Sequence, residues 1–198
     1  MVTGWDKRMV KNEAENLAKI FWKAHEDFDF VGPTGSFSEC IDAAVASNKH
    51  PFFISDSGDN PTAGGSGDMT WGLIHVLDRP EFKQPAGPTV IYASVPGAKA
   101  VKSCIEAGIG ATVTVTAGAD VDNVHSGPIT VTGRVHAIKH GDRDAGIEVV
   151  LQVGSVFAIL TQMRKPYHHE HDFTDLNLKP READIVIVQD WLPRAGTA

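Results

Sequence analysis

Several features that would place a protein in a class at once are scarce or absent in this sequence. It has only two cysteines among 198 residues, Cys40 and Cys104, which excludes a disulfide framework. Both lie in helix-like segments among apolar neighbours, so we expect free, buried thiols. Lys and Arg number 18 against 25 Asp and Glu, with no basic stripe, so nucleic acid is not an expected partner.

Long hydrophobic runs are also absent. No apolar stretch approaches the roughly 20 residues that cross a bilayer, and the N-terminus lacks a signal-peptide pattern. We therefore expect a cytoplasmic protein with no membrane partner. With 198 residues, of which 42% are hydrophobic, the chain is long enough for one packed domain.

The most distinctive stretch that is present is a glycine-rich, acidic loop at residues 56–68. It separates a strand-like run, 51–55, from a helix-like run, 69–77. Connections in α/β proteins usually have about two to six residues, and a longer polar loop at the carboxyl end of a strand is a common place for a site. The loop lacks the Gly-Lys-Ser/Thr ending of a P-loop and the Gly-x-Gly-x-x-Gly fingerprint of dinucleotide-binding proteins.

The residue types in this loop suggest a role in binding. Its glycines let the backbone approach a ligand closely, and an Asn-Pro pair fixes a turn. Asp68 is predicted to cap the next helix through the N–H of Thr70 or Trp71. The carboxylates can bind a divalent cation or orient a substrate amine, and a rigid turn with one helix cap is the purely structural alternative. The residues expected to face a cleft are Asp56, Asp59, Asn60, Pro61, Gly64, Gly65, Gly67 and Asp68.

Hydrophobic periodicity predicts an α/β fold: a mainly parallel sheet with flanking helices, plus an antiparallel β-lobe. Continuous apolar strands alternate with helices in the first half, where Ser36 and Glu39 form a capping box. Alternating Thr/Val strands then indicate an antiparallel lobe at about 111–161. The predicted helices are 6–25, 37–45, 69–78, 98–107 and 172–178, and the predicted strands of the α/β part are 52–55, 88–93 and 184–188.

Histidines offer a second candidate site. His168, His169 and His171 form the densest cluster and are a possible set of transition-metal ligands, although neighbouring residues do not all converge on one ion. A surface turn in which Asp172 caps a helix is the competing interpretation. His75 can point back toward the acidic loop, or simply pack within its helix.

The C-terminal strand carries a further expectation. Residues 185–188 are apolar throughout, which calls for burial of both faces, and the ten residues after them are too few for a covering helix. We therefore expect the chain to be shortened relative to its own architecture and to associate as a homo-oligomer through an uncovered part of the sheet. Alternatively, helix 6–25, with Trp5, Phe21 and Trp22, covers that face.

Several of these segments together resemble the C-terminal domain of the MlrC family, which are zinc metallopeptidase-like proteins. The Asp-Asn-Pro-x-x-Gly-Gly pattern inside the loop is quite specific. The resemblance covers most of residues 10–188, and its matching pieces are 56–68, 90–93, 107–111, 127–133 and 183–188.

The resemblance implies a single MlrC C-terminal-like domain over residues 1–198. Its α/β part spans about 6–110 and 172–190, and its β-lobe about 111–161. The family carries its zinc ligands on an N-terminal domain that has no counterpart here, so zinc is implied for the family and not for this chain alone. The implied role is the substrate-side domain of a metallopeptidase or amide hydrolase, with the Asp56–Asp68 loop facing the active-site cleft.

Two other functions stay open. The chain can be a non-catalytic interaction domain that acts only with a separate metal-binding partner chain. It can also bind a metal by itself through the histidine cluster. The implied substrate is a peptide or a small amide, catalytic residues are unassigned, and independent catalysis is uncertain because the metal-ligand domain is missing.

Overall fold

A computed structural model describes residues 1–29 and 32–189, which divide into two compact units, Met1–Gly35 and the part from Ser36 onward. The first unit contains helix α1 (Lys7–Ala24) and the short 3₁₀ helix η1 (His25–Asp27). The Asp6 carboxylate caps α1 by accepting hydrogen bonds from the backbone N–H groups of Arg8 and Met9, at 2.8 and 3.1 Å. No residue of α1 is buried.

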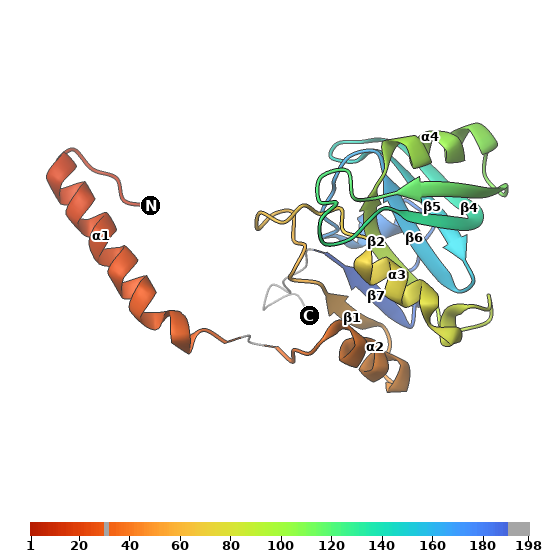
Figure 1. Ribbon diagram of the computed structural model, residues 1–198, viewed down its shortest axis with the longest axis horizontal. Helices are drawn as coiled ribbons and strands as arrows, with labels where there is room; N and C mark the ends of the chain where they lie inside the picture. The colour runs from red at the N-terminus through yellow and green to blue at the C-terminus, as the bar shows by residue number, and fades with distance from the viewer. Residues whose placement is uncertain (30–31, 190–198) are drawn as a thin grey trace. The chain divides into compact units, whose positions relative to one another are not determined.

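The second unit is built around a seven-stranded sheet in the described part of the chain (Figure 1). In sheet order the strands run β1-β7-β2-β6-β5-β4-β3. Their bounds are β1 Phe52–Ser55, β2 Val90–Pro96, β3 Thr112–Ala117, β4 Ile129–Asp142, β5 Gly146–Val153, β6 Val156–Thr161 and β7 Ile185–Val188. The helices of this unit are α2 Phe37–Ala46, α3 Trp71–Asp78, η2 Pro80–Phe82, α4 Ala98–Ala107 and α5 Glu170–Thr174.

The sheet has a parallel half and an antiparallel half, so the predicted α/β class with both kinds of strand is confirmed. Strands β1, β7, β2 and β6 are parallel neighbours, whereas β6, β5, β4 and β3 pair antiparallel. β6 belongs to both halves, so the antiparallel strands continue the same sheet. Strands β1 and β2 do run parallel, but β7 lies between them and pairs with both.

Two hydrophobic cores lie on opposite faces of the sheet, as the alternation of side chains along β2 shows. Val90 and Tyr92 belong to the core that α2, α3 and α4 cover. Ile91 and Ala93 belong to the other core, which is covered by the segment that follows β6. That segment contributes the apolar side chains of Tyr167, Phe173, Leu176 and Leu178.

The apolar strand β7 is covered on both faces by the chain itself. Ile185 and Ile187 pack in one core, Val186 and Val188 pack in the other, and all four are buried. The expectation that this strand leaves part of the sheet uncovered is therefore wrong. β7 lies between β1 and β2 and pairs with both. The segment that contains α5 covers one of its faces, so a helix after β7 is not needed.

Smaller expectations are confirmed or corrected in the same way. The capping box forms, because the Ser36 hydroxyl accepts from the Glu39 N–H while the Glu39 carboxylate accepts from the Ser36 N–H. The helix predicted to begin at Asp172 begins at Glu170 and ends at Thr174. Cys104 is buried, Cys40 is half-buried, and neither forms a disulfide.

Among the described residues, no helix has the length and apolar character needed to cross a membrane.

Candidate functional site

The glycine-rich loop connects the end of β1 to the start of α3. The four parallel strands run in one direction, so their carboxyl ends meet at the same edge of the sheet, and the loop lies there. Residues that follow β6 and β7 reach it as well, as the hydrogen bonds described below show. This edge is the usual location of ligand sites in open α/β sheets.

The Asp59 side chain holds the loop together from inside. It is 3% exposed, and one carboxylate oxygen accepts hydrogen bonds from the Ser66 hydroxyl and the Gly67 N–H, both at 2.7 Å. The other oxygen accepts from the Met69 N–H at 2.9 Å. A buried carboxylate needs such donors, so Asp59 organises the loop and is not available to a ligand.

Asp68 ties the loop to a different part of the chain, and its predicted role as a helix cap is wrong. Thr70 is the N-cap residue of α3, and it makes no side-chain capping bond. The Asp68 carboxylate instead accepts from the backbone N–H groups of Val121 and Asp122, at 2.5 and 3.2 Å, in the β3–β4 connection. The long-range pairing satisfies a carboxylate that is only 1% exposed.

Two other polar side chains shape local turns and stay closer to solvent. The Asp56 carboxylate accepts from the Gly58 N–H at 2.8 Å, and the Asn60 side-chain oxygen accepts from the N–H groups of Thr62 and Ala63 at 2.8 and 3.1 Å. These are Asx turns, which fix the outer part of the loop. Both Asp56 and Asn60 are half-exposed, so they remain accessible to a ligand.

The predicted glycines serve distinct purposes. At Gly65 the backbone passes so close to residue 60 that an added Cβ would lie 2.8 Å from the Asn60 nitrogen. Gly67 has φ +65°, and its added Cβ would lie 2.8 Å from the Cβ of Pro61. Gly64 has φ +98° with open space around it, so only its backbone conformation calls for glycine.

Two residues that the sequence did not single out also hold the loop. The Arg164 guanidinium, just after β6, donates to the Ser66 carbonyl at 2.8 Å and to the Gly65 carbonyl at 3.4 Å. The buried Gln189 side chain, just after β7, donates to the Asp59 carboxylate at 3.4 Å. Gln189 directly follows the predicted strand 184–188, and Arg164 lies three residues beyond the predicted β-lobe; these positions are their only sequence signal.

Tyr92 lies beneath the loop, in the core on the α3 side. Its hydroxyl accepts from the Leu73 N–H and the Gln189 side chain. Burial, and then the negative charges of Asp56 and Asp59, raise the pKa of Tyr92 well above its usual range. The hydroxyl therefore stays protonated, and it joins the start of α3 to Gln189, which itself contacts Asp59. A tyrosine in an otherwise apolar strand run, 90–93, was the available sequence signal.

The histidine cluster lies elsewhere, beside a pocket of about 360 Å³ that is also lined by Asp142, Lys165 and Asp172. The rings of His169 and His171 stack at 5.1 Å. Asp172 occupies the third position of α5, not the predicted cap position, and its carboxylate accepts from the N–H groups of His168 and His169. His75 does not reach toward the loop, since its ring hydrogen-bonds the Trp71 carbonyl of its own helix.

A buried ionic network forms the floor of that pocket. The Lys165 ammonium contacts the carboxylates of Asp142, Glu148 and Asp172 at 2.7, 3.0 and 3.1 Å. The Tyr167 hydroxyl donates to Glu148 at 2.6 Å. Burial acts to lower the pKa of Lys165, but its hydrogen bonds to Asp142 and Glu148 outweigh burial and raise it. Lys165 therefore has a structural role as the cation that holds these three carboxylates together.

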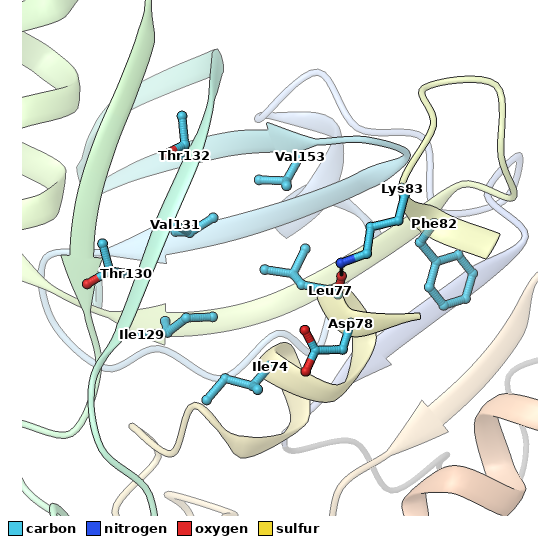
Figure 2. A pocket seen from close by; sticks show the side chains of 10 residues that line it. All are labelled: Ile74, Leu77, Asp78, Phe82, Lys83, Ile129, Thr130, Val131, Thr132 and Val153. Atoms are coloured by element: carbon cyan, nitrogen blue, oxygen red, sulfur yellow. Dashed lines mark hydrogen bonds between the residues drawn. The ribbon is translucent and has the colours of Figure 1, made fainter. Parts of the chain in front are cut away.

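A second pocket, of about 350 Å³, opens between α3 and the antiparallel strands (Figure 2). Ile74 and Leu77 of α3 and Val131 of β4 form part of its lining, and the Lys83 ammonium donates to the Leu77 carbonyl at 2.5 Å. Neither of these two pockets is lined by residues of the 56–68 loop.

Comparison with known proteins places this arrangement in a family. Residues 54–194 match the family model described as MlrC C-terminus. The chain belongs to the MlrC C-terminus family. The match begins within β1, immediately before the loop, and it includes the β3–β4 connection and Arg164.

Relatives of this MlrC C-terminal chain are considerably longer. It is 26% identical over 188 residues to microcystinase C of Sphingomonas sp., a match that covers 89% of this chain and 36% of the relative. It is also similar to the crystal structure of a protein from Mesorhizobium sp. BNC1 described as a candidate metallopeptidase, with a TM-score of 0.69 and 20% identity. That match covers 88% of this chain and 36% of the other, so the chain spans about a third of each relative's length.

The metal suggested by metallopeptidase-like relatives does not fit the residues found here. Among residues 1–29 and 32–189, no group of three or more His, Cys, Asp and Glu side chains is arranged to hold a metal ion. The carboxylates of Asp59 and Asp68 are buried and accept hydrogen bonds from the protein itself, and that of Asp172 contacts Lys165 and two backbone amides. We therefore derive no metal-dependent step from this chain.

Proposed function

We propose that this chain is the substrate-side domain of an MlrC-like zinc metallopeptidase or amide hydrolase, and that the Asp56–Asp68 loop faces the active-site cleft. The observation that carries the proposal is the fixed loop at the carboxyl edge of the parallel strands. Four side chains hold it in place: Asp59, Asp68, Arg164 and Gln189. The match to the MlrC C-terminus family and the similarity to microcystinase C support the reaction class.

The proposed task of the loop is to bind and orient the substrate. Its buried residues keep the backbone in one conformation, so little conformational entropy is lost when a ligand binds. Asp56 supplies a half-exposed negative charge suited to a peptide amine, and the exposed stretch Ser57–Gly58 supplies backbone groups for a peptide main chain. We include a cytoplasmic location in the proposal, because cysteines that form no disulfide suit a reducing compartment.

The experiment is a titration of the ¹⁵N-labelled chain with short linear peptides, followed by two-dimensional NMR. We expect the amide signals of residues 56–68 to shift in a saturable way. Asp56→Asn keeps the turn, since an Asn side chain also accepts from the Gly58 N–H, but removes the charge. It should weaken binding of peptides with a free amine about two- to fivefold.

Asp78→Asn is the matched control, because Asp78 is an exposed carboxylate at the far end of α3 from the loop. It should leave binding unchanged. Shifts confined to residues outside 56–68, or equal binding by Asp56→Asn and wild type, would count against the proposal.

The second candidate is a non-catalytic interaction domain that needs a separate metal-binding partner chain. It is favoured by the residues that the structure describes, among which no group of three or more His, Cys, Asp and Glu side chains is arranged to hold a metal ion. Peptide hydrolysis by the isolated chain after addition of zinc would remove this candidate. Stoichiometric zinc retained by the chain after dialysis would instead favour the histidine cluster as an independent metal site.

A further inference from the structure

The β3–β4 connection, residues 118–128, contains a histidine that is paired with a carboxylate. Nδ1 of the His125 ring lies 2.7 Å from Oδ2 of Asp122. The His125 side chain is 70% exposed, whereas that of Asp122 is 22% exposed. A carboxylate that is largely shielded from solvent thus holds a ring that is open to a ligand.

The hydrogen bonds of Asp122 determine which ring nitrogen of His125 carries the hydrogen. Its other oxygen accepts from the N–H groups of Val124 and His125, at 3.0 and 3.2 Å. The bond from the His125 ring, followed by these two backbone bonds, holds the pKa of Asp122 below its usual range. An ionised carboxylate only accepts hydrogen bonds, so Nδ1 is the donor. The lone pair of the neutral ring is then on Nε2, which is free to accept from a ligand.

The chain just before His125 is bound to the glycine-rich loop, and the two segments lie side by side (Figure 1). The backbone N–H groups of Val121 and Asp122 donate to the carboxylate of Asp68, the last residue of the loop. Asp122 therefore joins the loop to the histidine directly, because its N–H contacts Asp68 and its carboxylate contacts the His125 ring.

The chain just after His125 is bound to the start of α3. The Thr70 hydroxyl, which is completely buried, hydrogen-bonds the Ser126 hydroxyl and donates to the Gly127 carbonyl, both at 2.6 Å. His125 is thus held from both sides, between the last residue of the loop and the first turn of the next helix. This places it at the candidate site.

We propose that His125 is a substrate-contacting residue of this site, whose Nε2 accepts a hydrogen bond from a main-chain N–H group of a bound peptide, and that Asp122 is its positioning residue. The inference rests on the proposed function, because the ligand is the peptide that the 56–68 loop binds. Asp56 supplies a negative charge to the peptide amine, and His125 supplies a neutral acceptor to an N–H group further along the peptide.

The competing interpretation is that Asp122 and His125 only stabilise the turn. The two backbone bonds to Asp122 already form an Asx turn without any contribution from the ring. An ion pair with one largely exposed partner contributes little to stability. The ring bond has a different effect, since it fixes the tautomer and the orientation of the imidazole.

The first test is the tautomer of His125 in the full chain, measured by long-range ¹H–¹⁵N NMR at about pH 8, where imidazoles are mostly neutral. We expect the Nδ1–H form. In Asp122→Asn the side-chain oxygen still accepts from the backbone, but its amide donates to Nδ1, so the ring should switch to the Nε2–H form. An Nε2–H form in the wild type would overturn the proposal.

The second test is titration with short linear peptides, observed at the His125 ring. Its signals should shift in a saturable way, with the same Kd as the amide signals of residues 56–68. Both His125→Ala and Asp122→Asn should weaken binding about two- to fivefold, because each removes the acceptor at Nε2. His140→Ala is the control, since His140 is an exposed histidine at the opposite end of β4 from the connection, and it should bind as wild type does.

The outcomes separate this inference from the proposed function. Shifts at residues 56–68 with an unchanged His125 ring, or equal binding by His125→Ala and wild type, would overturn the inference alone. Shifts at the His125 ring without shifts at 56–68 would support its contact with the peptide and count against the role of the loop. No shift at either place would overturn both. Because the His125 ring is mostly exposed, circular dichroism should show that His125→Ala unfolds at the wild-type temperature.

Discussion

Single carboxylates decide the local structure of the candidate site, and they do so as acceptors for backbone donors. Asp59 and Asp68 sit at the two ends of the same loop region, and each satisfies two or more N–H or O–H groups. Hydrogen bonds to a charged acceptor are stronger than neutral ones, and buried donors left without a partner are destabilising. The loop therefore depends on these side chains as well as on its glycines.

Removal of the Asp59 carboxylate should loosen the loop and destabilise the fold. Asp59→Ala leaves the N–H groups of Gly67 and Met69 without their acceptor, so we expect a loss of about 3 kcal/mol in the free energy of unfolding. Urea denaturation measures it. Asp56→Ala is the control: it removes one bond at a half-exposed position and should cost under about 1 kcal/mol. Equal losses would contradict the assigned role.

Asp142 should make stability sensitive to acid. Burial alone would raise its pKa, but hydrogen bonds from Lys165 and the backbone outweigh burial and hold the pKa well below its usual range. A group with a lowered folded-state pKa stabilises the fold above its unfolded pKa of about 3.9 and loses that contribution as pH falls.

Asp142→Asn should therefore be less stable than wild type at pH 7 and lose less stability between pH 6 and pH 3. Urea midpoints across that range measure the effect. Asp120→Asn, at an exposed residue, should follow the wild-type curve. A wild-type slope for Asp142→Asn would show that this carboxylate does not carry the acid sensitivity.

At the scale of elements, the close approach of the β3–β4 connection to the start of α3 braces the candidate site. Gly118 has φ +79°, and an added Cβ there would lie 2.2 Å from the Thr70 side chain. The Ala119 N–H, next to it, donates to the Asp68 carbonyl at 2.9 Å. A side chain at position 118 would thus force the two segments apart.

Gly118→Ala should destabilise the protein by about 3 kcal/mol or more, because it combines a left-handed backbone with a steric clash. Gly141→Ala isolates the first effect, since Gly141 has φ +78° and open space around it, and should cost about 1 kcal/mol. Thermal and urea unfolding give both values. If the two variants lose the same stability, the close approach contributes nothing.

At the scale of the molecule, the chain consists of a helical N-terminal unit and a sheet-based unit with its own two cores. All residues of both cores lie at position 37 or later. We therefore expect a variant that lacks residues 1–33 to keep the wild-type unfolding temperature within about 3 °C, measured by circular dichroism. A loss of cooperative unfolding would show that the first unit is needed for the fold of the second.

Local sequence pattern determined most of the elements. The bounds of β1 and α4, the capping box at Ser36 and the change from continuous to alternating apolar strands followed from periodicity and end signals. These depend on neighbouring residues alone. The place of the 56–68 loop between a strand and a helix was also predictable, because its glycine-rich, polar composition separates two apolar segments.

Only the tertiary structure decided which distant groups meet. The place of β7 between β1 and β2, the bonds of Asp68 to the β3–β4 connection and the contact of Arg164 with Ser66 join residues that lie far apart in the chain. A carboxylate accepts any donor with suitable geometry, so sequence alone shows that Asp68 needs partners but not which ones. Sequence alone also does not show which segment covers β7. Hydrophobic burial has no direction, so any apolar segment of the right shape can supply the cover.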